Sequence, residues 1–247
     1  HYKNKITYLP DEKKTTVMDG HGGYMNGSRY YGEDLPINTW YMKRFAGLSE
    51  DGLSLWYYTD KETNEEKTTT TYSTGDFYLC GDPNPDLYGG FGTSITFHGF
   101  DLSTQFSYLV GGLTYDYGYA GMMGNPTATS VGNRWHKDVL KAWSPENPSS
   151  TIPRWYFNDL NTTGSSDRFL IDGSYLNLQN IQVGYTLPDS WTSHLKIKNL
   201  RLYFVCDNVY YWSKRKGLDP RRSISGVGTS GKIAPFRTYS GGISLQF

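Results

Sequence analysis

The sequence lacks the features that usually mark a disulfide-rich, helical-membrane or nucleic-acid-binding protein. Its only cysteines, Cys80 and Cys206, are too few for a disulfide scaffold and lack Cys-x-x-Cys spacing. The sequence leaves two states open, a disulfide bridge between them or two free thiols, and it favours two free thiols. No apolar run approaches the ~18 residues of a membrane helix. Lys and Arg number 24 and Asp and Glu also number 24, so no net basic charge attracts nucleic acid.

Motifs for catalysis or metal binding are also missing. The five histidines are scattered, without His-x-x-His or His-Glu-x-x-His spacing. Asp82, Asn84 and Asp86 match the first ligands of a calcium loop, but the glycine and the terminal glutamate of that loop are absent. A proline-rich turn is the better interpretation. We therefore expect neither an enzyme nor a protein that holds a metal or cofactor.

Aromatic residues and glycine, by contrast, are abundant. Aromatics make up 16% of the chain, with 22 Tyr, 7 Trp and 28 Gly, although the mean hydropathy is only −0.60. Tyr and Trp favour extended strands over helices. A wall of strands with one apolar and one polar face also averages to a polar hydropathy. The composition therefore favours an all-β protein and fits a porin-like barrel.

The segment Phe100–Val110 shows the clearest strand pattern. Apolar and polar residues alternate along it, which is the period of two that a strand requires. At ~3.3 Å per residue and a ~45° tilt it would cross ~25 Å, the height of the apolar band of an outer-membrane barrel. We expect a lipid-facing side formed by Leu102, Phe106 and Tyr108. We expect a lumen-facing side formed by Asp101, Ser103 and Gln105.

Further segments carry strand signals of differing strength. Phe91–Phe97 is joined to the strand at Phe100 by His98-Gly99, which predicts a hairpin with a tight turn. In Tyr175–Tyr185 the apolar residues change parity, which predicts a bulge or a plugged lumen. Other candidates are Leu200–Cys206 and, more weakly, Trp40–Leu48 and Leu53–Tyr58. Long irregular loops, typical of the outer side of such barrels, are expected at 60–75, 111–126 and 144–166.

The end of the chain alternates again. Tyr239, Ile243, Leu245 and Phe247 are separated by small or polar residues. A terminal strand of this kind, with a final Phe, resembles the signal by which outer-membrane barrels are assembled. A soluble sheet can end in a similar strand by chance. A secreted carbohydrate-binding β-sandwich with exposed Tyr and Trp is therefore the alternative.

Several segments, in this order, resemble SusC/RagA-type TonB-dependent transporters over residues 40 to 247. The first are Gly81-Asp82-Pro83-Asn84-Pro85 with Gly89-Gly90-Phe91, then Phe100-Asp101-Leu102-Ser103, Arg168-Phe169 and Ser174-Tyr175-Leu176-Asn177-Leu178-Gln179-Asn180-Ile181. They are followed by Gly184-Tyr185-Thr186-Leu187-Pro188, Asp207-Asn208, Tyr210-Tyr211-Trp212-Ser213, Gly217-Leu218-Asp219-Pro220 and the final segment from Phe236-Arg237-Thr238-Tyr239 to Phe247. The chain departs from the family at Cys80, where a small or apolar residue is common. It departs again at Arg221-Arg222, because an acidic residue often follows Asp-Pro in the family.

The resemblance implies the C-terminal strands of a barrel of about 22 strands in a Gram-negative outer membrane. It also implies TonB-coupled import of oligosaccharides or oligopeptides, with a SusD-like surface lipoprotein as partner. The plug, the TonB box and the targeting signal are expected upstream of His1. Residues 1–39 are expected to form a loop or partial strand region, and residues 40–247 the strands and loops that lead to the barrel C-terminus.

The number of strands leaves two arrangements open. About seven or eight strands are expected, and an open sheet edge is unstable in lipid because each unpaired backbone group costs several kcal/mol. The strands therefore close as a small eight-stranded barrel or pair with strands outside this chain. Irregular strand spacing and large loops favour the second arrangement.

Two groups of residues are candidates for contact with substrate or lipid. Trp155 and Tyr156 lie in a proline-rich loop and are the preferred substrate contacts, although most such aromatics pack in loops or form interfacial girdles. Lys214-Arg215-Lys216 and Arg221-Arg222 form the one basic cluster. A solvated loop is favoured there over contact with lipopolysaccharide phosphates. Membrane lipid and lipopolysaccharide are expected partners of the barrel as a whole, and nucleic acid is not.

Phe247 provides a test of the barrel interpretation. The change Phe247→Asp should severely lower the amount of folded full-length protein in the outer membrane, because assembly requires recognition of the terminal strand. The measurement is the heat-modifiable band in outer-membrane fractions. In a soluble sandwich the same change at an exposed end would alter stability by only about ±0.5 kcal/mol, so undiminished assembly would count against the barrel.

Overall fold

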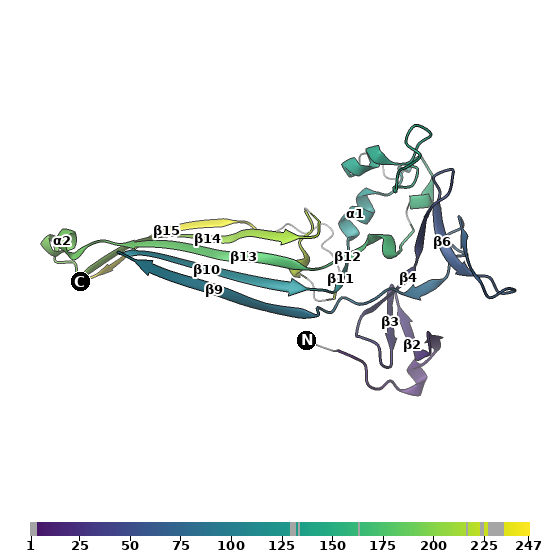
Figure 1. Ribbon diagram of the computed structural model, residues 1–247, viewed down its shortest axis with the longest axis horizontal. Helices are drawn as coiled ribbons and strands as arrows, with labels where there is room; N and C mark the ends of the chain where they lie inside the picture. Colours follow the sequence, from purple (N-terminus) through teal and green to yellow (C-terminus); the bar gives the residue numbers. More distant parts are fainter. Residues whose placement is uncertain are drawn as a thin grey trace.

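Most of the regular secondary structure of the protein is β-strand. The computed structural model describes residues 4–128, 132, 134–162, 164–215, 217–222, 225–226 and 235–247. The strands form four sheets. Figure 1 shows one long sheet that extends away from a lobe of smaller sheets and short helices, which we call the head lobe. Among the described residues, no helix is long and apolar enough to cross a membrane.

The long sheet contains five antiparallel strands. They are β9 (Leu87–Phe97), β10 (Phe100–Val110), β13 (Tyr175–Thr186), β14 (Asn199–Ser213) and β15 (Thr238–Gln246). Their order across the sheet is β15-β14-β13-β10-β9. In the described part of the chain β15 and β9 do not pair with each other, so the sheet is open. Of the two arrangements left open by the sequence, the small eight-stranded closed barrel is therefore wrong.

The hairpin between β9 and β10 is confirmed. Phe97 lies opposite Phe100, which leaves His98 and Gly99 as a two-residue turn. Both turn residues have positive φ, 47° and 85°, as a type I′ turn requires. Glycine at the second position is favoured because an added Cβ would lie 2.7 Å from the carbonyl oxygen of Thr186.

The predicted bulge in β13 is also confirmed. Gln105 lies opposite Asn180, but the next residue, Phe106, lies opposite Leu178. Gln179 is therefore an extra residue in β13 relative to β10. The extra residue reverses the parity of the strand, so Leu178 shares a face with the apolar residues that follow the bulge.

The head lobe contains most of the remaining elements. One sheet comprises β1 (Thr16–Met18), β2 (His21–Asn26), β3 (Arg29–Gly32), β4 (Thr39–Lys43) and β8 (Phe77–Leu79). A second comprises β5 (Phe45–Leu48), β6 (Ser54–Thr59) and β7 (Glu66–Thr69). In a third, β11 (Leu113–Tyr115) pairs with β12 (Leu170–Asp172), and α1 (Tyr117–Met122) follows β11. A further short helix, α2 (Asp189–Thr192), lies at the opposite end of the molecule, beyond the long sheet (Figure 1).

The head lobe corrects several expectations. The predicted strand Trp40–Leu48 is two strands, β4 and β5, in different sheets, and neither belongs to the long sheet. The stretches 60–75 and 111–126 are not wholly irregular, because they hold β7, β11 and α1. The lobe has its own buried core, formed by Trp40, Met42, Tyr115, Met123 and Phe169. Burial in this core, rather than a membrane face, accounts for these apolar residues.

The β9–β10 turn yields a stability prediction. The change Gly99→Ala in the full-length protein should cost about 1–3 kcal/mol, because alanine disfavours positive φ and its Cβ would crowd Thr186. The apparent unfolding temperature of the detergent-solubilised protein, followed by heat modifiability, should therefore fall. Gly241→Ala is the control, since the nearest atom to its added Cβ is 3.8 Å away. An equal fall for both variants would contradict the assigned turn.

Candidate functional site

The long sheet has one continuous apolar face. The register aligns residues from all five strands on it. They include Phe91, Ile95, Phe97, Phe100, Leu102, Phe106, Tyr108, Leu178, Ile181, Val183, Leu202, Phe204, Cys206, Ile243 and Leu245. Many are exposed, with Phe97 at 69%. No second sheet or helix covers this face in the described part of the chain, so the face is available to an apolar environment.

The predicted lipid-facing residues lie together on this face. Leu102 lies between Ile95 and Val183, and Phe106 lies between Phe91 and Leu178. The Phe91 and Phe106 rings stack with centroids 4.8 Å apart. Tyr108 follows on the same face. Such aromatic and aliphatic cross-strand pairs stabilise the sheet itself as well as forming its apolar surface.

The opposite face is polar and carries the three residues predicted to line the lumen. Asp101 accepts two hydrogen bonds from Arg201, at 2.9 and 2.5 Å, in a bidentate pair across the strands. Ser103 lies opposite Gln182, and Gln105 lies opposite Asn180. The structure therefore places all three on one face, as the alternation predicts. The Arg201 partner was not predicted, because it lies 100 residues away in sequence.

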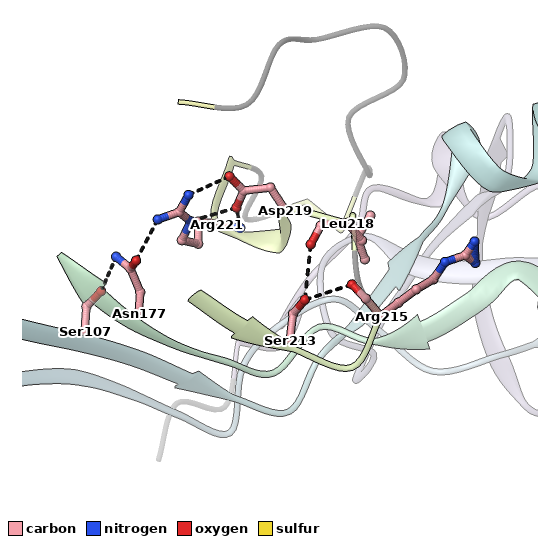
Figure 2. A network of polar contacts seen from close by, with 7 residues as sticks. All are labelled: Ser107, Asn177, Ser213, Arg215, Leu218, Asp219 and Arg221. Carbon is pink, nitrogen blue, oxygen red and sulfur yellow. Dashed lines mark hydrogen bonds and ion pairs between the residues drawn. The ribbon is translucent and has the colours of Figure 1, made fainter. Parts of the chain in front are cut away.

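The polar face continues into a network with the β14–β15 connection, residues 214–237 (Figure 2). Arg221 donates to Asp219 through two bonds of 2.8 Å and to Asn177 of β13 at 2.7 Å. Asn177 donates in turn to Ser107 of β10 at 3.3 Å. The Arg221 guanidinium also lies over the ring of Tyr211. These contacts hold residues 219–221 against the polar face of the long sheet.

A second set of contacts joins the same connection to the head lobe. Figure 2 shows the Arg215 side chain pointing away from the Arg221 network and toward that lobe. Arg215 pairs with Asp116 at 3.2 Å and lies 3.4 Å above the Tyr119 ring of α1. The amide of Tyr115 donates to the carbonyl oxygen of Gly226 at 2.8 Å. The connection therefore ties the sheet to the head lobe.

These contacts correct the interpretation of the basic cluster. The expectation that the cluster lies in a solvated loop is wrong for Arg221, since the side chains of Arg221 and Asp219 are only 13% and 4% exposed. Arg215 and Arg221 already have acidic partners, so among the described side chains of the cluster Lys214 is the exposed cation. Lys216 and the Arg222 side chain lie outside the described residues.

The terminal strand follows its predicted alternation. Tyr239, Ile243 and Leu245 lie opposite Cys206, Leu202 and Leu200 on the apolar face. Phe247 follows the end of β15 and is 73% exposed. The edge of β15 away from β14 has no strand partner in the described residues. Three of the four predicted assembly residues thus lie along an unpaired edge strand, and Phe247 follows it directly.

The two cysteines are not bridged. Both are free thiols, Cys206 in β14 and Cys80 next to the head-lobe core. Burial raises the pKa of the Cys80 thiol to about 11, so it is protonated at neutral pH. Cys206 is 6% exposed among the apolar side chains. Neither cysteine combines with other side chains into a metal site in the part of the chain that the structure describes.

The two candidate substrate contacts differ in their surroundings. Trp155 donates from its indole nitrogen to the carbonyl oxygen of Gly124 at 3.0 Å and packs edge-on against Trp135. Tyr156 is 50% exposed, beside an exposed Phe157. Trp155 is therefore engaged in loop packing. Tyr156 is the more exposed of the two, although the Arg154 guanidinium lies 5.6 Å from its ring centroid.

Comparison with known proteins gives consistent results. No family model matches the sequence. TonB-dependent receptor P3 of Formosa agariphila is 28% identical over 275 residues, which cover 99% of this chain and 26% of that protein. TonB-dependent receptor SusC of Bacteroides thetaiotaomicron is 27% identical over 180 residues, 72% of this chain and 17% of that protein.

Solved structures agree with these relatives. The RagAB peptide importer in the open-open state matches with a TM-score of 0.75 and 25% identity, over 98% of this chain and 25% of that chain. The RagAB peptide transporter matches with a TM-score of 0.74 over 90% of this chain. This chain spans about a quarter of the length of the P3 receptor and of the RagAB chain. The two-faced sheet, the relatives and the structural matches together show that this chain is similar to one part of the barrel of the SusC/RagA-type TonB-dependent receptors of the outer membrane.

Proposed function

We propose that this chain forms part of the wall of a TonB-dependent importer, with its apolar face toward lipid and its polar face toward the lumen. The observation that carries the proposal is the pair of contrasting faces on one uncovered sheet. A soluble protein rarely exposes a contiguous apolar surface of this kind. Leu102, Phe106 and Tyr108 would then contact lipid, and Asp101, Ser103 and Gln105 would line the lumen.

The open edges of the sheet support the same proposal. In the hydrocarbon core an unpaired backbone N–H or C=O has no water to bond. The free edges of β9 and β15 would therefore pair with strands of the full-length protein outside this chain. A secreted β-sandwich is not supported, because its apolar face would be covered by a second sheet. The relatives named above also favour the importer over that alternative.

The relatives suggest the cargo and the partners. The solved RagAB structures are of a peptide importer, and SusC is a TonB-dependent receptor. We accordingly assign to the full-length protein the uptake of oligopeptides or oligosaccharides, a SusD-like surface lipoprotein and energy from the TonB system. A plug and a TonB box would lie in the part of the protein that precedes this chain. Exposed Tyr156 is the preferred substrate contact, with Trp155 supporting its loop.

The proposed faces make a mutational prediction. Phe106→Arg in the full-length protein should destabilise the barrel by ~2–4 kcal/mol, because the guanidinium would enter hydrocarbon near the middle of β10. Gln105→Arg is the matched control one residue away, and it should cost much less because it faces the lumen. Both are measured as folded protein in outer membranes and as apparent unfolding temperature in detergent. Equal losses for both variants would contradict the assigned faces.

Uptake by cells tests the function itself. A strain that lacks the full-length gene should lose uptake of the cognate fluorescent oligopeptide or oligosaccharide, and the wild-type gene should restore it only when TonB is present. Restoration with Tyr156→Ala should lower uptake several-fold at limiting substrate while outer-membrane levels stay unchanged. Leu140→Ala, at another exposed head-lobe side chain, is the control. Uptake that continues without TonB would refute the importer proposal.

A further inference from the structure

A surface depression lies on the apolar face of the long sheet, at the end next to the head lobe. Three cross-strand partners form its floor, because Tyr108 of β10 lies opposite Leu176 of β13, which lies opposite Trp212 of β14. Trp212 is 49% exposed, and its ring packs edge-on against that of Tyr210 at 4.9 Å. The depression has a volume of about 510 Å³ and is open to the surface. An apolar chain can therefore reach its floor from outside the sheet.

Polar groups line the same depression at its head-lobe margin. Lys214 follows the end of β14 and is exposed, and Asp172 and Ser174 lie just before β13. The Asp172 carboxylate accepts hydrogen bonds from the Ser174 hydroxyl at 2.5 Å and from the Ser174 amide at 2.9 Å. The bond from the Ser174 hydroxyl chiefly lowers the pKa of Asp172, and the charge of Lys214 lowers it further, so the carboxylate is ionised. One cation and one anion thus border an apolar floor.

The depression lies at the outer end of the proposed wall. The two-residue turn at His98-Gly99 closes the other end of the sheet, whereas the head lobe lies at this end (Figure 1). In outer-membrane barrels short turns lie on the periplasmic side and long loops on the outer side. The strands β10, β13 and β14 are the three central strands of the sheet. Further strands that pair with the free edges of β9 and β15 would therefore not separate the depression from lipid.

We propose that this depression binds lipid A, the acylated and phosphorylated sugar that anchors lipopolysaccharide in the outer leaflet. This inference rests on the proposed importer function, which places the apolar face of the sheet in the outer membrane. An acyl chain of lipid A packs on Tyr108, Leu176 and Trp212. A phosphate of the sugar accepts hydrogen bonds from the Lys214 ammonium, and sugar hydroxyls donate to the Asp172 carboxylate.

The place of the depression in the membrane favours lipid A over a glycerophospholipid. Phosphatidylethanolamine carries a phosphate and an ammonium, which would also match Lys214 and Asp172. It is, however, a lipid of the periplasmic leaflet, and the depression lies at the opposite end of the sheet. Lipid A supplies the acyl chain, the phosphate and the hydroxyl donors at the outer end. Phosphatidylethanolamine is therefore the comparison lipid in the test.

Lipid binding to the purified, delipidated full-length receptor in detergent tests the proposal. The probes are lipid A, dephosphorylated lipid A and phosphatidylethanolamine, and the bound fraction is measured by native mass spectrometry. Wild-type protein should bind lipid A more tightly than either of the other two lipids. Lys214→Gln should bind lipid A about 5- to 10-fold more weakly than wild type, because one charge-assisted contact is lost. The same variant should bind dephosphorylated lipid A as wild type does.

Two further variants separate the charge from the apolar floor. Trp212→Ala should weaken the binding of both forms of lipid A several-fold, because the apolar contact does not depend on the phosphate. Lys198→Gln is the matched control, since Lys198 is exposed and immediately precedes the other end of β14. It should bind all three lipids as wild type does.

Two results would overturn the proposal. One is wild-type protein that binds phosphatidylethanolamine as tightly as lipid A, which needs no variant to fold. The other is an equal loss of lipid A binding in Lys214→Gln and Lys198→Gln, because that loss would reflect charge alone. Binding is measured without substrate or TonB, so either result is distinct from a failure of TonB-dependent uptake.

Discussion

The need to pair every backbone amide and carbonyl in the absence of water shapes this structure. In hydrocarbon only continuous strand-to-strand hydrogen bonding satisfies those groups. The long sheet meets this condition through four antiparallel ladders that run from β9 to β15. Side chains are then free to differ between the two faces. The two faces and the short turn at Gly99 are compatible with that requirement, and the open edges of β9 and β15 would meet it only by pairing with further strands.

A single extra residue preserves the two faces where the sequence pattern changes. Without the bulge at Gln179, Leu176 and Leu178 would point to the polar face. With it, Leu178 lies beside Phe106, and Asn177 turns to the polar face. Asn177 can then join Ser107 to Arg221 (Figure 2). The same irregularity therefore keeps the apolar face continuous and anchors the β14–β15 connection to the sheet.

The long sheet could be predicted from the sequence and the head lobe could not. The strand Phe100–Val110 has one apolar and one polar face, so apolar and polar residues alternate in its sequence and predict the strand. In β4 all five residues are buried, so no alternation reveals which sheet the strand joins. The Asp101–Arg201 and Asp116–Arg215 pairs join residues about 100 positions apart. Local patterns carry no information about such partners.

The unequal lengths of neighbouring strands have a consequence for the outer rim of the wall. β14 has 15 residues, whereas β15 pairs with it only as far as Asp207. At ~3.3 Å per residue and a ~45° tilt, β14 would rise ~35 Å, about 10 Å more than an apolar band of ~25 Å. The last residues of β14 would lie in the aqueous layer, among the sugars of lipopolysaccharide. Water would there form hydrogen bonds with the β14 backbone groups that β15 does not pair. The rim is therefore stepped at this point, where β14 extends beyond its pairing with β15.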